Sequence, residues 1–286
     1  MSSPCLRAAE GTPFLLGTRI RGLGSPSGVA VLVLVFLGCA LVAFVGQEPV
    51  VALTLLVGTV VLFGLWFVRL TSAVRSNNDG VALLLRGDEA GAAGKFREVV
   101  GQWHSPDAVA MALHNLGIVA LRGRDVVSAT AILRACLEAG KTFRFKNVPD
   151  TWSALAHAHL GFALAAQGQV NEADAELAWL RGVTPSHLPM AIAYASRAHA
   201  MMAIRSERYA EAVALLDADK PLLRNVLTGS ESVLAEAMLA YALTKLGGVY
   251  EGETRTPDPV YADEESRSFV RAYLPEAEGC LQGRAS

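Results

Sequence analysis

Two long apolar runs lie near the N-terminus of the chain. Residues 28–46 (GVAVLVLVFLGCALVAFVG) and residues 50–68 (VVALTLLVGTVVLFGLWFV) contain no charged side chain. Each run of about 19 residues measures roughly 28 Å as an α-helix, close to the thickness of the hydrocarbon core of a bilayer. A helix that is apolar on every face for this length is typical of a membrane span. The pattern therefore predicts a transmembrane helical hairpin over residues 28–70.

The residues around this hairpin predict its orientation. Only residues 47–49 separate the two runs, so the two helices are expected to be antiparallel neighbours. Arginines precede the first run and follow the second, whereas the connection has none, and positively charged flanks favour the cytoplasmic side. We therefore expect an integral membrane protein with both termini in the cytoplasm, residues 1–27 forming an N-terminal segment and residues 71–79 a linker. The Ala- and Gly-rich, cysteine-poor composition favours a bacterial inner (plasma) membrane.

Beyond residue 79 the pattern changes to Ala- and Leu-rich helical segments separated by short turns. In four places a small residue lies midway along a helix, an alanine follows twelve positions later, and a large apolar residue follows four positions after that. The four sets are Gly80, Ala92 and Phe96; Gly117, Ala129 and Leu133; Gly161, Ala173 and Leu177; and Ala200, Ala212 and Leu216. Antiparallel helices approach closely where both present small side chains, and a bulky residue one turn further fills the space beside the crossing. The pattern predicts an all-α fold of stacked helical hairpins over residues 80–247.

These hairpins resemble the tetratricopeptide repeat superfamily. The third hairpin carries the resemblance best, through Leu160-Gly161, Gly168, Asn171-Glu172-Ala173, Leu177 and Pro185, and the fourth adds Tyr209-Ala210-Glu211-Ala212. The resemblance implies an α-solenoid whose first helices line a groove for protein segments. The units differ from the family in being longer than its usual repeat of about 34 residues. The alternative interpretation is a non-repetitive helical bundle.

The last part of the chain, residues 248–286, does not continue the repeat. A fifth first helix is expected over residues 232–246, but the Gly-, Pro- and acid-rich residues 248–262 that follow indicate a loop. A short helix is expected over residues 263–274, because Phe269, Val270, Tyr273 and Leu274 fall on one side of it. We interpret this helix as a cap for the open face of the terminal repeat.

The sequence contains no motif that indicates catalysis or metal binding. His157 and His159 are two positions apart on a helix, so their side chains diverge instead of sharing an ion. Residues 140–142 (GKT) resemble the end of a phosphate-binding loop, but Ala135 occupies the position of the required glycine. We therefore expect no metal, no cofactor and no enzymatic activity. A formal net charge of −2 without a broad basic field predicts no nucleic-acid partner.

Basic and aromatic residues share faces of the expected first helices. The candidate partner-binding residues are His114, Arg122, Tyr194, Arg197, Met201, Arg205, Tyr241 and Lys245. Such a face suits an acidic protein segment with hydrophobic anchors. The alternative is that the arginines are solvated charges on an outer face. We therefore expect a membrane-anchored, tetratricopeptide-like scaffold or adaptor that recruits protein partners at the cytoplasmic face of the membrane. The alternative function is a small integral subunit of a membrane transport or secretion complex.

Overall fold

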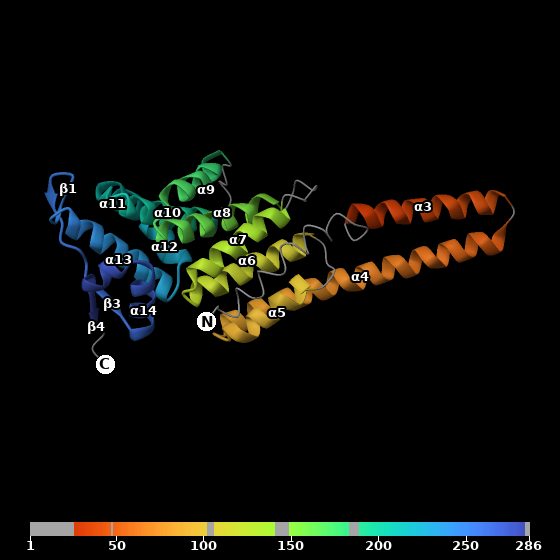
Figure 1. The fold of residues 1–286 in the computed structure, drawn as a ribbon, viewed down its shortest axis with the longest axis horizontal. Coiled ribbons are helices and arrows are strands. Elements are labelled where there is room, and N and C mark those ends of the chain that lie inside the picture. The colour runs from red at the N-terminus through yellow and green to blue at the C-terminus, as the bar shows by residue number, and fades with distance from the viewer. Residues whose placement is uncertain (1–25, 47, 102–105, 141–148, 183–188, 284–286) are drawn as a thin grey trace. The chain divides into compact units, whose positions relative to one another are not determined.

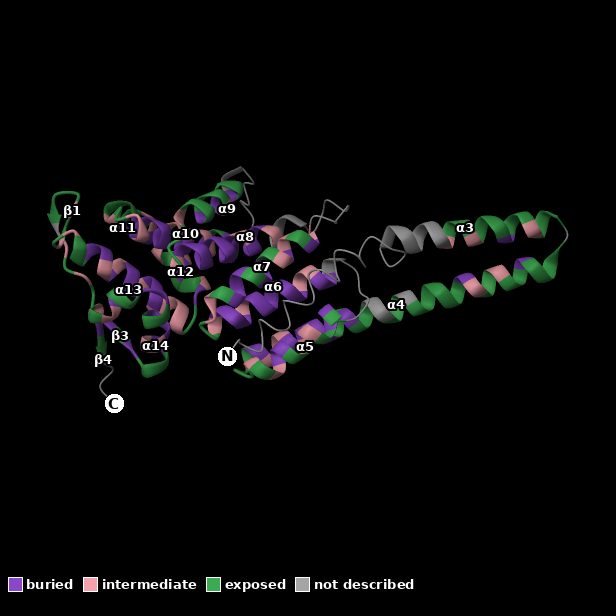
Figure 2. Cartoon of the chain, in the orientation of Figure 1, coloured by how far each residue is buried: buried purple, intermediate pink, exposed green. Residues whose placement is uncertain are grey.

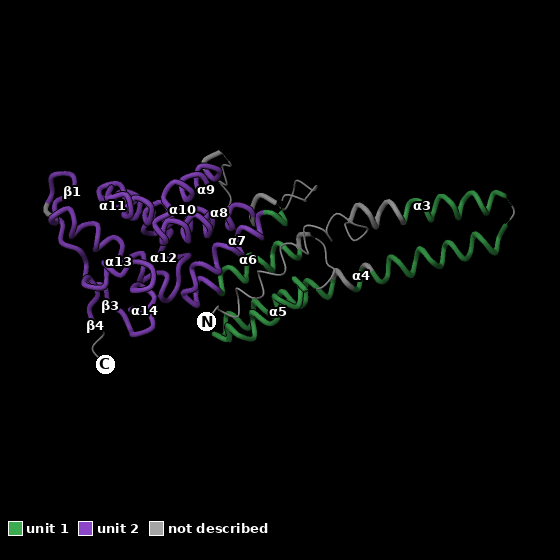
Figure 3. Tube along the Cα trace, viewed as in Figure 1, with its two compact units in different colours: residues 1–119, 138–144 green, residues 120–137, 145–286 purple. Residues whose placement is uncertain are grey.

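The structure is a computed structural model that describes residues 26–46, 48–101, 106–140, 149–182 and 189–283 (Figure 1). Nearly all of the expected N-terminal segment, residues 1–27, lies outside these ranges. The chain divides into two compact units, which we describe separately (Figure 3). Unit 1 comprises residues 1–119 and 138–144, and unit 2 comprises residues 120–137 and 145–286. The described residues are almost entirely helical, as the sequence predicts.

Unit 1 begins with two antiparallel helices, α3 (Pro26–Val45) and α4 (Pro49–Leu85). Large apolar side chains are exposed on both, and most of the described ribbon of the two helices has the green colour of exposed residues in Figure 2. Nevertheless, no helix in the described part of the chain is long and apolar enough to cross a membrane. This finding overturns the predicted transmembrane hairpin over residues 28–70 and the predicted integral membrane protein. The alternative function, a small integral subunit of a membrane transport or secretion complex, is not tested by this finding.

The expected linker, residues 71–79, is helical and belongs to α4. Its polar residues do not form a loop because two of them, Ser76 and Asn77, are buried. Asn115 of α6 (Pro106–Arg122) donates from its amide nitrogen to Asn77 Oδ1 at 2.9 Å, so the polar side chains hold α6 against α4. Buried amides that satisfy each other avoid the cost of an unpaired polar group. The helix therefore continues to Leu85 before the chain turns into α5 (Glu89–Gly101).

Unit 2 contains the end of α6 and the remaining helices. Second helices α7 (Val126–Gly140), α9 (Val170–Gly182) and α11 (Tyr209–Ala218) alternate with first helices α8 (Pro149–Ala166), α10 (Pro189–Arg205) and α13 (Ser230–Lys245). Helix α10 packs against α8 and α13, and each of α8 and α10 packs against the second helix that follows it. The helical hairpins of unit 2 are thus stacked side by side, which is a solenoid-like arrangement. The short helix α12 (Lys220–Val226), which the sequence analysis did not predict, lies between α11 and α13.

The four interhelical turns share one backbone conformation. In each, the residue seven positions after the small residue is left-handed: Gly87 (φ 83°), Arg124 (φ 63°), Gly168 (φ 77°) and Glu207 (φ 58°). The next N–H reaches back five residues to a helix carbonyl, in the bonds Asp88→Leu83, Asp125→Ala120, Gln169→Leu164 and Arg208→Ala203, all of 2.8–3.0 Å. This is the Schellman arrangement that ends a helix and satisfies its last carbonyls. The turns therefore recur at the same offset from the small residue of each hairpin.

The anchor residues of the repeat are buried in all four hairpins. The close contact differs from the prediction, in which glycine and alanine face each other. A Cβ added to Gly161 would lie 2.7 Å from Cδ2 of Leu177, and one added to Gly80 would lie 2.6 Å from Cε1 of Phe96. The bulky residue thus occupies the space that the missing glycine side chain leaves. In these two hairpins the glycine is required by the large side chain of the facing helix.

The C-terminal part of unit 2 contains short strands that the all-α prediction missed. Strands β1 (Val249–Tyr250) and β2 (Glu253–Thr254) form a hairpin around Glu251-Gly252, both left-handed as a two-residue turn of this kind requires. Strand β3 (Val260–Ala262) pairs in parallel with β4 (Leu281–Gly283). Between them lie α14 (Glu264–Tyr273), close to the helix expected over residues 263–274, and the 3₁₀ helix η1 (Pro275–Cys280). Asp263 caps α14 by accepting from the backbone N–H of Ser266 at 2.8 Å.

Candidate functional site

The candidate site is the face of unit 2 formed by the last turn of α6 and by helices α8, α10 and α13. We call it the first-helix face, and its central residues are Leu121, Phe162, Tyr194, Arg197 and Arg205. Most of the candidate residues from the sequence lie on or near this face. His114 lies in unit 1, where it is buried, and is therefore not part of it. Met201 is fully buried inside unit 2 and offers no surface to a partner.

Arg197 lies at the centre of the first-helix face, and its side chain is only 1 % exposed. Its guanidinium donates to Glu231 Oε1 of α13 at 3.1 Å and lies over the ring of Phe162, 4.2 Å from the ring centroid. A buried cation needs such a carboxylate partner, because an unpaired charge in the interior is very costly. The aromatic face below it adds a cation–π attraction. Arg197 therefore connects α8, α10 and α13 and is not a solvated charge.

Tyr194 belongs to the same cluster. Its hydroxyl donates to Glu231 Oε2 at 3.3 Å, and its ring lies 5.0 Å from the guanidinium carbon of Arg197. Burial raises the pKa of Tyr194 to about 12, and the charge of Glu231 adds to this, while Arg197 and Arg122 oppose it. The phenol thus stays protonated and remains a donor at physiological pH. Glu231 was not among the predicted site residues, since nothing in the local pattern of α13 marks it as a partner for α10.

Helix α14 covers part of the first-helix face. Its apolar residues Phe269, Val270 and Tyr273 are buried, as is Leu274 directly after it. The ring of Tyr273 packs against Phe162 with 5.2 Å between centroids, and its hydroxyl donates to the backbone carbonyl of Leu121 at the end of α6. Burial raises the pKa of Tyr273, although the nearby charge of Arg197 lowers it, so this phenol is neutral as well. The predicted cap therefore lies across several first helices.

Arg205 binds the end of this C-terminal segment. Its Nη2 donates to the backbone carbonyl of Tyr273 at 2.9 Å, and its Nη1 donates to Glu276 Oε1 of η1 at 2.8 Å. Burial alone would raise the pKa of Glu276, but a backbone hydrogen bond and the bond from Arg205 together hold this pKa below its usual value, with help from the charge of Lys245. Glu276 is thus a carboxylate at neutral pH. Arg205 and Lys245 supply the positive charge that the sequence predicted for this face.

The remaining candidate residues lie at the edges of this face. Arg122 is partly buried, and its charge reaches the hydroxyl of Tyr194. Tyr241 and the exposed Lys245 form a cation–π pair on α13, with 5.4 Å from the ammonium to the ring centroid. Tyr209 of α11 approaches the edge of Tyr241. These residues are accessible, so partner binding by them stays a prediction.

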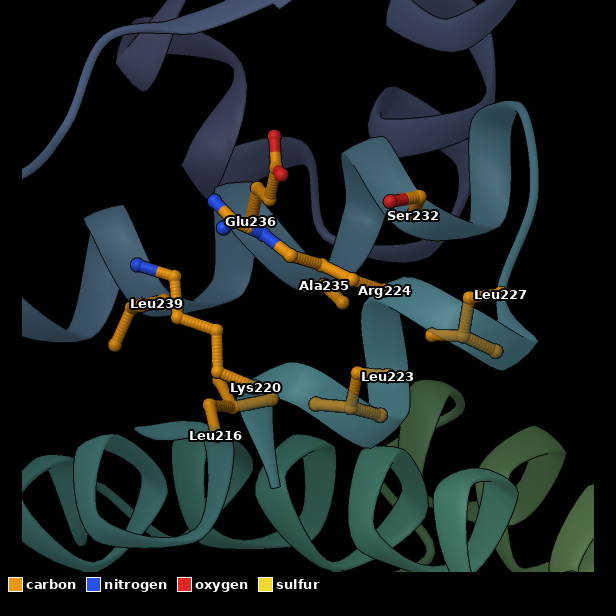
Figure 4. Close-up of a pocket in the computed structure, with 9 residues that line it drawn as sticks. All are labelled: Leu216, Lys220, Leu223, Arg224, Leu227, Ser232, Ala235, Glu236 and Leu239. Atoms are coloured by element: carbon orange, nitrogen blue, oxygen red, sulfur yellow. The ribbon is translucent and has the colours of Figure 1, made fainter. Parts of the chain in front are cut away.

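Histidine, cysteine and acidic side chains are the ones that could form a metal centre. No group of three or more His, Cys, Asp or Glu side chains in the described ranges is placed to hold a metal ion. His157 pairs with Glu176 at 2.6 Å and stacks on Trp179, whereas His159 lies against Tyr194, so the two histidines diverge. A hollow of about 30 Å³ between α11, α12 and α13 has an apolar floor that includes Leu216 and Leu223 (Figure 4). Its volume suits little more than a water molecule.

Comparison with protein-family models, with curated proteins and with solved structures finds no match to this chain.

Proposed function

We propose that this chain is a protein-interaction scaffold or adaptor built from tetratricopeptide-like helical repeats. In this proposal a helical segment of a partner protein binds at the first-helix face of unit 2. Two features support it. The four turns and their buried anchor residues repeat in register, which is typical of repeat modules that bind proteins. Stacked helical hairpins of this kind commonly present one face of their first helices to a partner helix or peptide.

The observation that carries the proposal is the way this face holds an amphipathic helix. Aromatic residues of α14 pack on Phe162, and Arg205 pairs with both a backbone carbonyl and a carboxylate of the same segment. These contacts are of the kind by which helix-binding grooves recognise their ligands, namely apolar anchors with charge-assisted hydrogen bonds at one end. The same contacts fit an acidic partner segment with hydrophobic anchors.

Site-specific photo-crosslinking tests this function in the full chain. A photoreactive phenylalanine derivative at Lys245, an exposed position close to Glu276, reports on the first-helix face. The same residue at Val127, which is 63 % exposed on the second helix α7, is the matched control. We expect discrete crosslinked protein partners from position 245 and none of these partners from position 127. Equal crosslinking from both positions, or none from position 245, would show that this face does not bind proteins.

A further inference from the structure

We propose that the C-terminal segment, residues 264–280, is a built-in competitor for the first-helix face, and that an external partner displaces it. This inference rests on the proposed function. It also gives the chemistry of the partner: an amphipathic helix with two aromatic residues four positions apart, followed three positions later by a carboxylate. Phe269, Tyr273 and Glu276 supply this pattern in the chain itself.

The contacts of the C-terminal segment are those of a ligand bound by one side. The side with Phe269, Val270 and Tyr273 is buried, whereas Arg271 and Ala272 on the opposite side are exposed. A helix with one apolar face is stable only while that face is covered. The same side chains in a partner helix would find the same acceptors and rings on the first-helix face.

The segment is also organised to leave as one piece. Strands β3 and β4 flank α14 and η1 and pair with each other, and Arg271 donates to Glu278 within the segment at 2.5 Å. The connection upstream is held independently, because Arg255 pairs with Asp217 of α11 through both guanidinium nitrogens. Residues 260–283 therefore have pairings of their own, and their connection to the repeats at Arg255 does not depend on the contacts with the first-helix face.

The tether determines how strongly the segment competes. Residues 256–259 join the anchor at Arg255 to β3 and keep the segment at an effective concentration on the order of millimolar near its binding face. A partner in solution binds only the open fraction of molecules, so its apparent affinity falls in proportion to that fraction. If the segment covers the face in about nine molecules of ten, the partner binds about tenfold more weakly than to the open face.

Peptide binding to the full chain tests this inference. The probe is a fluorescent peptide of residues 263–280 with Cys280→Ser, which prevents disulfide formation. We expect the chain with Phe269→Ala and Tyr273→Ala to bind the peptide at least tenfold more tightly than the unaltered chain does. The control Ala272→Ser alters an exposed residue of the same helix and is expected to leave the affinity unchanged.

A charge reversal identifies the binding face. Adding Arg205→Glu to the double variant is expected to weaken binding of the peptide at least tenfold, and a peptide with Glu276→Lys is expected to restore it. The same reversal at Arg208, which pairs only within α11 and its turn in the described contacts, is expected to change nothing. Equal binding by the unaltered and double-variant chains, or no binding by a double variant of normal helical content, would refute the inference.

Hydrogen exchange in the unaltered chain provides a second measurement that needs no variant. We expect the amides of α14 and η1 to exchange at least tenfold faster than those of α8 and α10, because the segment opens without global unfolding. Exchange of α14 in step with α8 and α10 would show that it is a permanent part of the core. Crosslinked partners at position 245 together with no peptide binding would keep the proposed function and reject the built-in competitor.

Discussion

Replacing Gly80 by alanine tests the close approach of α4 and α5. The added Cβ would lie 2.6 Å from Cε1 and 2.9 Å from Cδ1 of Phe96, whereas carbon atoms in contact are normally about 3.5–4.0 Å apart. The ring of Phe96 is fully buried. Overpacking of this kind costs about 1–3 kcal/mol, and alanine regains about 1 kcal/mol through its higher helix propensity. We expect Gly80→Ala to lower the free energy of unfolding by about 1 kcal/mol.

The same hairpin offers a matched control. Gly94 lies on the exposed side of α5, and a Cβ added there would meet nothing within 4 Å. Gly94→Ala should therefore raise the free energy of unfolding by about 0.5–1 kcal/mol, since only the backbone entropy and helix propensity change. The same Gly→Ala substitution is thus expected to lower the free energy of unfolding at position 80 and to raise it at position 94. In a Phe96→Leu background, which removes the clashing ring atoms, the cost of Gly80→Ala should largely disappear.

Hydrogen exchange of the α5 amides at increasing denaturant concentration is the appropriate assay. It reports the opening free energy of unit 1 itself, which a global melting curve of a chain with two compact units does not. If Gly80→Ala stabilises α5 as much as Gly94→Ala does, or if its cost is unchanged by Phe96→Leu, then the glycine is not required by the packing of Phe96.

Three further predictions concern other buried groups. Gly161→Leu should lower the free energy of unfolding of unit 2 by at least about 1–3 kcal/mol, because its Cβ would clash with Leu177; unchanged exchange in α8 and α9 would contradict this packing. Glu231→Ala leaves the guanidinium of Arg197 buried without its carboxylate and should cost about 3–5 kcal/mol in denaturant unfolding, so a loss below about 1 kcal/mol would mean that the pair is solvated. Burial lowers the pKa of His114 to about 4, although a hydrogen bond with the side chain of Asn115 opposes this. As the pH falls, the unfolded chain therefore binds a proton at this histidine before the folded chain does. The stability of unit 1 should therefore fall as the pH decreases from about 6.5 towards 4, by roughly 2 kcal/mol at pH 5, and His114→Gln should abolish this dependence if the assignment is right.

The repeat could be predicted from the sequence because its determinants are local. The small residue, the alanine and the large apolar residue of each hairpin lie within about 16 positions, and hairpin packing depends on residues at that separation. The turn conformation was less predictable. In the second turn the left-handed residue is Arg124 and not the neighbouring Gly123, because the repeat of the helix-ending hydrogen bonds fixes the position.

The apolar runs show the limit of composition. Counting apolar residues predicted a membrane hairpin, while the structure describes no helix that is long and apolar enough for a span. Residues 71–79, which follow the second run, were interpreted as a linker because their composition is polar. The structure shows that they continue α4, and that Asn77 pairs with Asn115 of α6, which is 38 positions away in the sequence.

The sequence by itself determined the helices, the repeated hairpins and the apolar side of α14, since these follow from residues close together in the chain. Only the tertiary structure decided what covers that apolar side, because Tyr273 meets Leu121 across 152 positions and Glu276 meets Arg205 across 71. The tertiary structure also decided that Arg197 is buried. The position of this residue along α10 is the same whether its side chain faces water or Glu231. Periodicity shows which residues share a face, but the partner of a face is set by the packing of segments that are distant in sequence.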